Sequence, residues 1–111
     1  MSIPHTQAGQ PVAVTPYAQA LSTQKTVALF KSAQLEVIRL VLAAGKSMPL
    51  HKVAGETTLQ CIEGCIDVQL DGSSTRLAAG HMLFLPSQVP HALHAREDSS
   101  ALLTLVLCRA A

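Results

Sequence analysis

The feature that most constrains this chain is a series of short apolar runs, rich in β-branched residues and separated by turn residues, from about residue 26 onward. Examples are "TVALFKS", "LEVIRLVL", "TTLQCIE", "CIDVQLDG" and "ALLTLVLC". Such runs are typical of strands, and the dipeptide Asp71-Gly72 between two of them is a strong hairpin signal. No segment keeps an apolar period of about 3.6 residues over the length of a helix. About eight strands joined by short turns predict an all-β sandwich or barrel.

One strand is apolar on both of its faces. In "LEVIRLVL", positions 35, 37, 39 and 41 share one face and positions 36, 38, 40 and 42 share the other. Because both sets are mainly aliphatic, the strand is expected to be covered on two sides or to enter a subunit contact.

Composition excludes several classes of protein. The 111 residues suit one domain, and 49% hydrophobic with 14% charged residues argues against disorder. A net charge of +1 and 3% aromatic residues argue against nucleic-acid binding, which needs basic patches or base-stacking rings. No apolar run reaches the roughly 20 residues that a membrane-spanning helix needs.

Residues 1–24 are rich in Pro, Gln, Ser, Thr and Ala, and are expected to form an extended arm before a barrel domain over residues 25–111. A short edge strand is expected around Val12 to Val14, limited by Pro11 and Pro16, which lack a backbone donor. The N-terminus has neither the basic start nor the apolar run of a signal peptide, and the three cysteines do not suggest a disulfide framework. A cytoplasmic location is therefore expected.

Two motifs carry the strongest signal. The first is "GKSMPLHKVAGETTLQCIEG", from Gly45 to Gly64, and the second is "GHMLFLPSQVPHALHA", from Gly80 to Ala95. Their order and their Gly, Pro and His anchors resemble the two signature motifs of the cupin superfamily, in particular its small single-domain bacterial members. This resemblance implies a jelly-roll barrel, the double-stranded β-helix of about six to eight strands.

The resemblance also implies a metal site, but with departures. The family binds one metal through two histidines and a glutamate of the first motif and a histidine of the second. Here His51 and His91 match, whereas Val53 replaces the second histidine and Thr57 occupies the glutamate position. Glu56 lies one place earlier, and a bulge would turn it inward. His51, Glu56 and His91 would then suit one divalent ion such as iron, manganese, nickel or zinc. In the alternative, the two histidines are hydrogen-bonded cavity residues and Glu56 is solvated.

Strand parity predicts the lining of a ligand pocket. If Thr57 faces inward, Leu59 and Cys61 do so too, and other apolar residues are expected to add a wall. The expected lining is Met48, Thr57, Leu59, Cys61, Met82 and Phe84. Cys61 is expected to be an inert buried thiol unless it lies beside His51 or His91. His94 is expected to face away from the barrel, and His81 to be exposed.

Three functions remain open at this point. The barrel binds a small organic ligand as a sensor or carrier, or it is a metal-dependent dioxygenase or isomerase, or it is a metal-free isomerase with His51 or His91 as general base. A strict motif count leaves only two inward polar groups, which favours binding and leaves the catalytic residues unspecified. The apolar strands and the arm further predict a homodimer.

Overall fold

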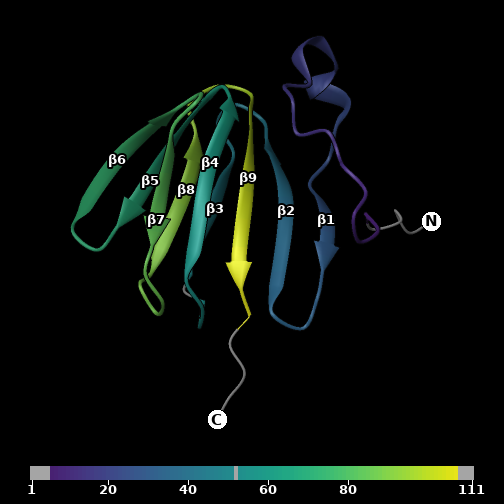
Figure 1. Cartoon of the computed structure of the whole chain (residues 1–111). Helices are drawn as coiled ribbons and strands as arrows, with labels where there is room; N and C mark the ends of the chain where they lie inside the picture. The colour runs from purple at the N-terminus through teal and green to yellow at the C-terminus, as the bar shows by residue number, and fades with distance from the viewer. Residues whose placement is uncertain (1–5, 52, 108–111) are drawn as a thin grey trace.

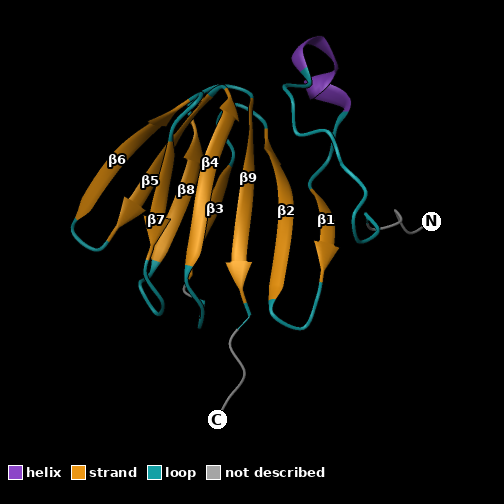
Figure 2. Cartoon of the chain, viewed as in Figure 1, coloured by secondary structure: helices purple, strands orange, loops and turns teal. Residues whose placement is uncertain are grey.

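The chain is described by a computed structural model for residues 6–51 and 53–107. This part contains nine strands and one short 3-10 helix, η1 (Ala18–Thr23), shown in Figures 1 and 2. The strands are β1 (Val27–Lys31), β2 (Leu35–Leu42), β3 (Ser47–His51), β4 (Thr57–Glu63), β5 (Cys65–Leu70), β6 (Ser73–Ala78), β7 (Met82–Leu85), β8 (His91–Ala95) and β9 (Ser99–Val106). No helix in these ranges is long and apolar enough to cross a membrane.

The strands form two antiparallel sheets. Sheet A has the order β1-β2-β9-β4-β7, and sheet B has the order β3-β8-β5-β6. Consecutive strands often lie in different sheets, as β4 and β5 do, which is the connectivity of a jelly roll. The all-β jelly-roll barrel expected from the sequence is therefore confirmed.

The core lies between the two sheets, and on β4 buried and half-buried residues alternate. On β4, Thr57, Leu59 and Cys61 are buried, whereas Thr58 and Gln60 between them are half-buried on the other face. Ile66 and Val68 of β5, Leu77 of β6, Leu93 of β8 and Leu103 of β9 join the same apolar cluster. The parity predicted for β4 is confirmed.

Strand β2 is covered on both faces, as its sequence predicted. Leu40 and Leu42 belong to the core between the sheets. On the opposite face Arg39 is only 1% exposed, because Tyr17 of the N-terminal segment lies over its guanidinium, 4.1 Å from the ring centroid. The second cover is thus the chain's own N-terminal segment.

The N-terminal segment differs from the expected extended arm. It contains η1, and Leu21 of this helix is buried. Val12 and Val14, although described by the structure, form no strand and are 41% and 37% exposed, so the expected edge strand is wrong. Pro11 and Pro16 bracket this stretch and cannot donate the hydrogen bonds that a strand there would need.

Two glycine turns shape the chain around sheet B. Asp71 and Gly72 close the β5–β6 hairpin, with Gly72 at φ 75°, as the dipeptide predicted. Gly64 has φ 85° and joins β4 to β5, which belong to different sheets. A Cβ atom on Gly64 would overlap the Asp98 carbonyl oxygen and the Ser99 side chain, so only glycine fits there.

Candidate functional site

Strands β4 and β8 begin at one end of the barrel, the lower end in Figure 1, where β7 and β9 finish. Thr57, the first residue of β4, pairs with Leu85 on one side and Leu105 on the other. The loop before β8 is tied to the loop before β4, since the Gln88 backbone N–H donates to the Val53 carbonyl oxygen at 2.9 Å. The positions that carry the family motifs therefore gather at this end.

His91 begins β8 and is 4% exposed. Its Nδ1 lies 3.2 Å from the Val89 carbonyl oxygen. The pairing of β3 with β8 sets the His51 and His91 Cα atoms opposite each other, after a bulge between Met48 and His51. The side chain of His51 lies outside the described part of the structure.

The acidic position of the first motif is occupied by Thr57, which is 2% exposed. Among the described atoms, its Oγ1 finds no hydrogen-bond partner. Glu56 is exposed, and its backbone carbonyl accepts a hydrogen bond from the Val106 N–H at 2.9 Å. The expected inward turn of Glu56 is therefore wrong, because Glu56 is exposed and β4 begins after it with Thr57 on the inner face.

The described residues do not fit the metal site that the family motifs imply. Among the described side chains, which do not include that of His51, no group of three or more His, Cys, Asp or Glu is placed to hold a metal ion. A threonine hydroxyl stands where the carboxylate is expected, and neutral hydroxyls are weak ligands for the divalent ions in question.

Some of the residues that were expected to line the pocket face into the barrel, and others do not. Leu59 and Cys61 are fully buried on the inner face, and Met48 is half-buried against the core. Met82 and Phe84 are 59% and 54% exposed, so their predicted inward position is wrong. Because Thr57 pairs with Leu85, the inner face of β7 carries Leu83 and Leu85, and the alternate residues point away.

The Cys61 thiol behaves as a core group. Burial, reinforced by the nearby Cys65, raises the pKa of Cys61 to about 11. The Sγ atom lies 3.4 Å from the Glu63 carbonyl oxygen, at the end of β4 away from Thr57. A thiol of this kind is protonated at neutral pH and is a poor nucleophile.

A polar cluster on the outer face of sheet A escaped the sequence analysis. Arg39 Nη2 donates to the Thr15 carbonyl at 2.8 Å and to Ser100 Oγ at 3.0 Å, and lies 3.4 Å from Glu63 Oε2. The Glu63 carboxylate also accepts the Tyr17 backbone N–H at 2.9 Å. The only feature of the sequence that could have indicated this cluster is Arg39, a charged residue within a mainly aliphatic strand.

The cluster keeps Glu63 ionised. Burial by itself raises the pKa of Glu63, but hydrogen bonds from the Ser100 hydroxyl and from the Tyr17 and Ala18 N–H groups, together with Arg39, leave it below its ordinary value. These contacts fasten the N-terminal segment to the barrel and lie on the outside of sheet A, so we assign the cluster a structural role.

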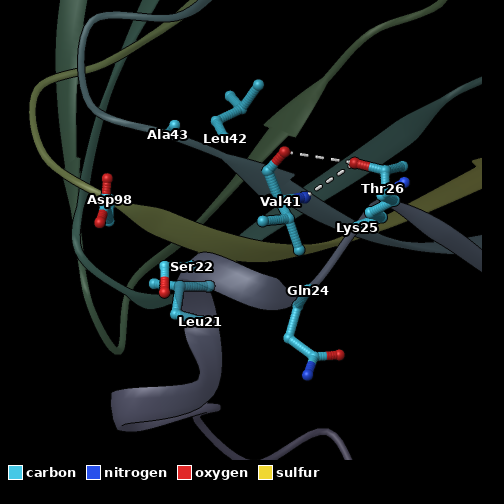
Figure 3. A pocket seen from close by; sticks show the side chains of 9 residues that line it. All are labelled: Leu21, Ser22, Gln24, Lys25, Thr26, Val41, Leu42, Ala43 and Asp98. Atoms are coloured by element: carbon cyan, nitrogen blue, oxygen red, sulfur yellow. Dashed lines mark hydrogen bonds between the residues drawn. The ribbon is translucent and has the colours of Figure 1, made fainter.

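The same segment forms one side of an open pocket of about 330 Å³ beside β2. Figure 3 shows its lining, in which the Thr26 hydroxyl and the Val41 backbone exchange hydrogen bonds of 2.9 and 3.3 Å. The lining mixes aliphatic groups such as Leu21 and Val41 with Lys25 and Asp98 at its edge. Asp98 is already engaged, since its carboxylate accepts the Ala44 N–H at 2.8 Å.

The remaining described histidines lie outside the barrel. His94 and His81 are exposed, as predicted. His94 is nevertheless engaged, because its Nδ1 lies 2.7 Å from Ser47 Oγ on the neighbouring strand β3.

Comparison with known proteins agrees with this architecture. A conserved protein of unknown function from Streptococcus pyogenes superposes with a TM-score of 0.76 at 21% identity, covering 99% of this chain and 97% of the other. A cupin superfamily protein from Desulfitobacterium hafniense gives 0.78 at 17% identity, covering 97% and 100%. The DMSP lyase DddQ from Ruegeria pomeroyi gives 0.67 at 24% identity, covering 73% of this chain and 45% of the enzyme.

At such identities these likenesses establish the fold alone, and no curated protein matches the sequence. The family model described as "Cupin domain" matches residues 38–108, which include both motifs and all strands from the second half of β2 to β9. The chain therefore belongs to the cupin domain family.

Proposed function

We propose that this protein binds a small organic ligand inside the barrel, at the end where Thr57 and His91 lie. The observation that carries the proposal is the buried Thr57 hydroxyl, which lacks a hydrogen-bond partner among the described atoms. Leaving such a group unpaired costs about 1 to 3 kcal/mol, and a polar atom of a ligand would remove this cost.

The surroundings define the class of ligand. Thr57 is followed on the inner face by Leu59 and Cys61, and it pairs with Leu85 and Leu105. A mainly apolar wall with one hydroxyl and one imidazole suits a small molecule with an apolar body and one or two polar atoms. We favour ligand binding over catalysis at this site because the described inner face presents no carboxylate at this end of the barrel.

The test is ligand-observed NMR with a set of small carboxylic acids, ketones and alcohols, followed by titration of any compound that binds. Thr57→Val keeps the shape of the side chain and removes the hydroxyl, so it is expected to weaken binding by about tenfold, as for one lost hydrogen bond. Thr58→Val, on the other face of β4, serves as the matched control. Equal affinity for both variants and the parent would contradict the assignment.

The same preparation tests the alternative of a metal-dependent enzyme. This alternative is supported by the pairing that sets His51 and His91 opposite each other. Metal content is measured by elemental mass spectrometry on protein purified without chelator, beside His51→Ala and Glu56→Ala. Absence of metal after incubation with iron, manganese, nickel and zinc supports the ligand-binding proposal. Near-stoichiometric metal that is lost in His51→Ala would replace it with the enzyme.

We also propose that the protein is a homodimer that pairs through the outer face of sheet A. This face carries large exposed hydrophobic side chains, namely Leu35, Met82, Phe84 and Val106. Exposed apolar residues that gather on one sheet face are typical of subunit contacts. The free thiols Cys61 and Cys65 support the reducing cytoplasm as the compartment.

A further inference from the structure

The outer face of sheet B carries a row of four polar residues in register. Ser47 of β3 pairs with His94 of β8, His94 pairs with Asp67 of β5, and Asp67 pairs with Arg76 of β6. Residues directly opposite one another on antiparallel strands share a face, with their Cβ atoms about 5 Å apart. A hydroxyl, an imidazole and a carboxylate are thus set side by side, outside the barrel.

The hydroxyl and the imidazole are in direct contact. Ser47 Oγ lies 2.7 Å from His94 Nδ1. Both residues are exposed, so a substrate can reach the oxygen. A serine hydroxyl within hydrogen-bond distance of an imidazole nitrogen is the arrangement by which a general base activates a nucleophile.

The carboxylate beside His94 is held in place. Asp67 Oδ2 accepts a hydrogen bond from Arg96 Nη1 at 2.9 Å, and Oδ1 lies 3.8 Å from Arg76 Nε. Its oxygens face the two arginines, and its position on β5 lies directly opposite His94 on β8.

A cavity of about 320 Å³ adjoins this row. Ser47, Asp67 and His94 contribute to its lining, together with Gln69 and the apolar residues Met48 and Leu93. A side-chain amide is one of the groups that stabilise a developing oxyanion. The volume is at the lower end of the range of small-molecule sites, which suits a small ester.

We propose that this groove is an acyl-transfer site that hydrolyses small esters with Ser47 as the nucleophile. Ser47 Oγ attacks the ester carbonyl carbon while its proton passes to His94 Nδ1, and the Gln69 amide donates to the oxyanion. The C–O bond to the leaving alcohol then breaks, and this alcohol takes the proton from His94. Water, deprotonated by His94, attacks the acyl-serine and releases the acid, which restores Ser47.

This proposal concerns the outer face of sheet B and is independent of the ligand site around Thr57. The probe is p-nitrophenyl acetate, with release of p-nitrophenolate followed by absorbance and the acetylated residue located by peptide mass spectrometry. The parent protein is expected to carry the acetyl group on Ser47 during turnover. Ser47→Ala and His94→Gln are each expected to lower the rate by about a hundredfold, the usual scale of general-base catalysis.

Two matched variants control for non-specific reaction with the ester. His81→Gln removes an exposed imidazole elsewhere, and Ser74→Ala removes an exposed hydroxyl of β6 on the same face as Gln69. Both are expected to keep the parental rate. A parental rate in Ser47→Ala, or acetyl groups found only on lysines such as the adjacent Lys46, would overturn the proposal.

The role of Asp67 is tested by separating kcat from KM. The charged groups around His94 are Asp67, Arg76, Arg96 and Lys46, which precedes β3. Asp67→Asn removes the negative charge beside the imidazolium that forms during acyl transfer, so kcat is expected to fall while KM keeps the parental value. An unchanged kcat in Asp67→Asn would show that Asp67 takes no part in the reaction.

Discussion

At the scale of single residues, Arg39 shows how a charge is accommodated in a small β protein. Its guanidinium is covered by the Tyr17 ring and contacts Glu63 and Ser100, yet its Nε has no partner among the described atoms. A buried cation remains tolerable only while its partners are present, because loss of one partner leaves an uncompensated charge. Stability should therefore depend strongly on Glu63.

Glu63→Gln is expected to lower the free energy of unfolding by about 3 kcal/mol, since it removes the charge that balances Arg39. The measurement is urea denaturation followed by circular dichroism. Glu97→Gln, an exposed position on the loop between β8 and β9, is the control and is expected to change stability by less than about 0.5 kcal/mol. Equal destabilisation of the two variants would contradict this role of Glu63.

The lowered pKa of Glu63 also predicts a dependence on pH. Because its folded pKa is below the ordinary value, the stabilisation is fully present above that ordinary value and is lost as the pH falls through the folded pKa. Denaturation midpoints measured over the acid range should therefore fall more steeply in the parent than in Glu63→Gln. Parallel curves for the two proteins would argue against an ionised Glu63 in the fold.

The two described cysteines should differ in reactivity. Cys61 is fully buried with a raised pKa, whereas Cys65 is half-buried. A maleimide at mildly alkaline pH is expected to label Cys65 before Cys61, and urea is expected to make both react. Peptide mass spectrometry over a time course measures this order, and early labelling of Cys61 would show that its thiol is not protected by the core.

At the scale of elements, two glycine turns allow the cost of a positive φ to be separated from the cost of a steric clash at the Cβ atom. Both Gly64 and Gly72 have positive φ, but a Cβ at Gly72 meets nothing within 4 Å, whereas one at Gly64 overlaps the Asp98 carbonyl and Ser99. Gly72→Ala is expected to cost about 1 kcal/mol from the backbone alone. Gly64→Ala is expected to cost at least about 2 kcal/mol more, measured by thermal and urea unfolding. A similar loss of stability in both variants would mean that the loop before β9 moves aside and relieves the clash at position 64.

Elements defined by local sequence were predictable. Asp71-Gly72 closes its hairpin, and counting back from Gly64 placed Thr57, Leu59 and Cys61 on the inner face. Local turn chemistry and the two-residue period carry this information.

Features set by distant partners were not predictable. The face of β7 depends on its pairing with β4, so Met82 and Phe84 were assigned to the wrong side. The bulge before His51 and the burial of Arg39 depend on β8 and on the N-terminal segment. The Ser47–His94 contact joins two strands that are far apart in sequence, and no motif signals it.

At the scale of the whole molecule, the proposed dimer predicts that substitutions on the outer face of sheet A change the oligomeric state. Phe84 pairs with Thr58, which in turn pairs with Thr104, so the exposed residues of β7 continue across the sheet into β9. Phe84→Asp places a charge on this face and is expected to shift a dimer to a monomer in light scattering at micromolar concentration. Ser74→Asp on sheet B is the control. A monomeric parent protein would refute the dimer.

The position of β9 has a consequence for how the protein is made. This strand is the last of the nine, yet it lies between β2 and β4 and joins the two halves of sheet A. During translation β1 and β2 can form a hairpin, but their open edge and that of β4 find no neighbour until Val106 has left the ribosome. The barrel must therefore close after synthesis of its last strand, and until then these edges are open to pairing with other chains.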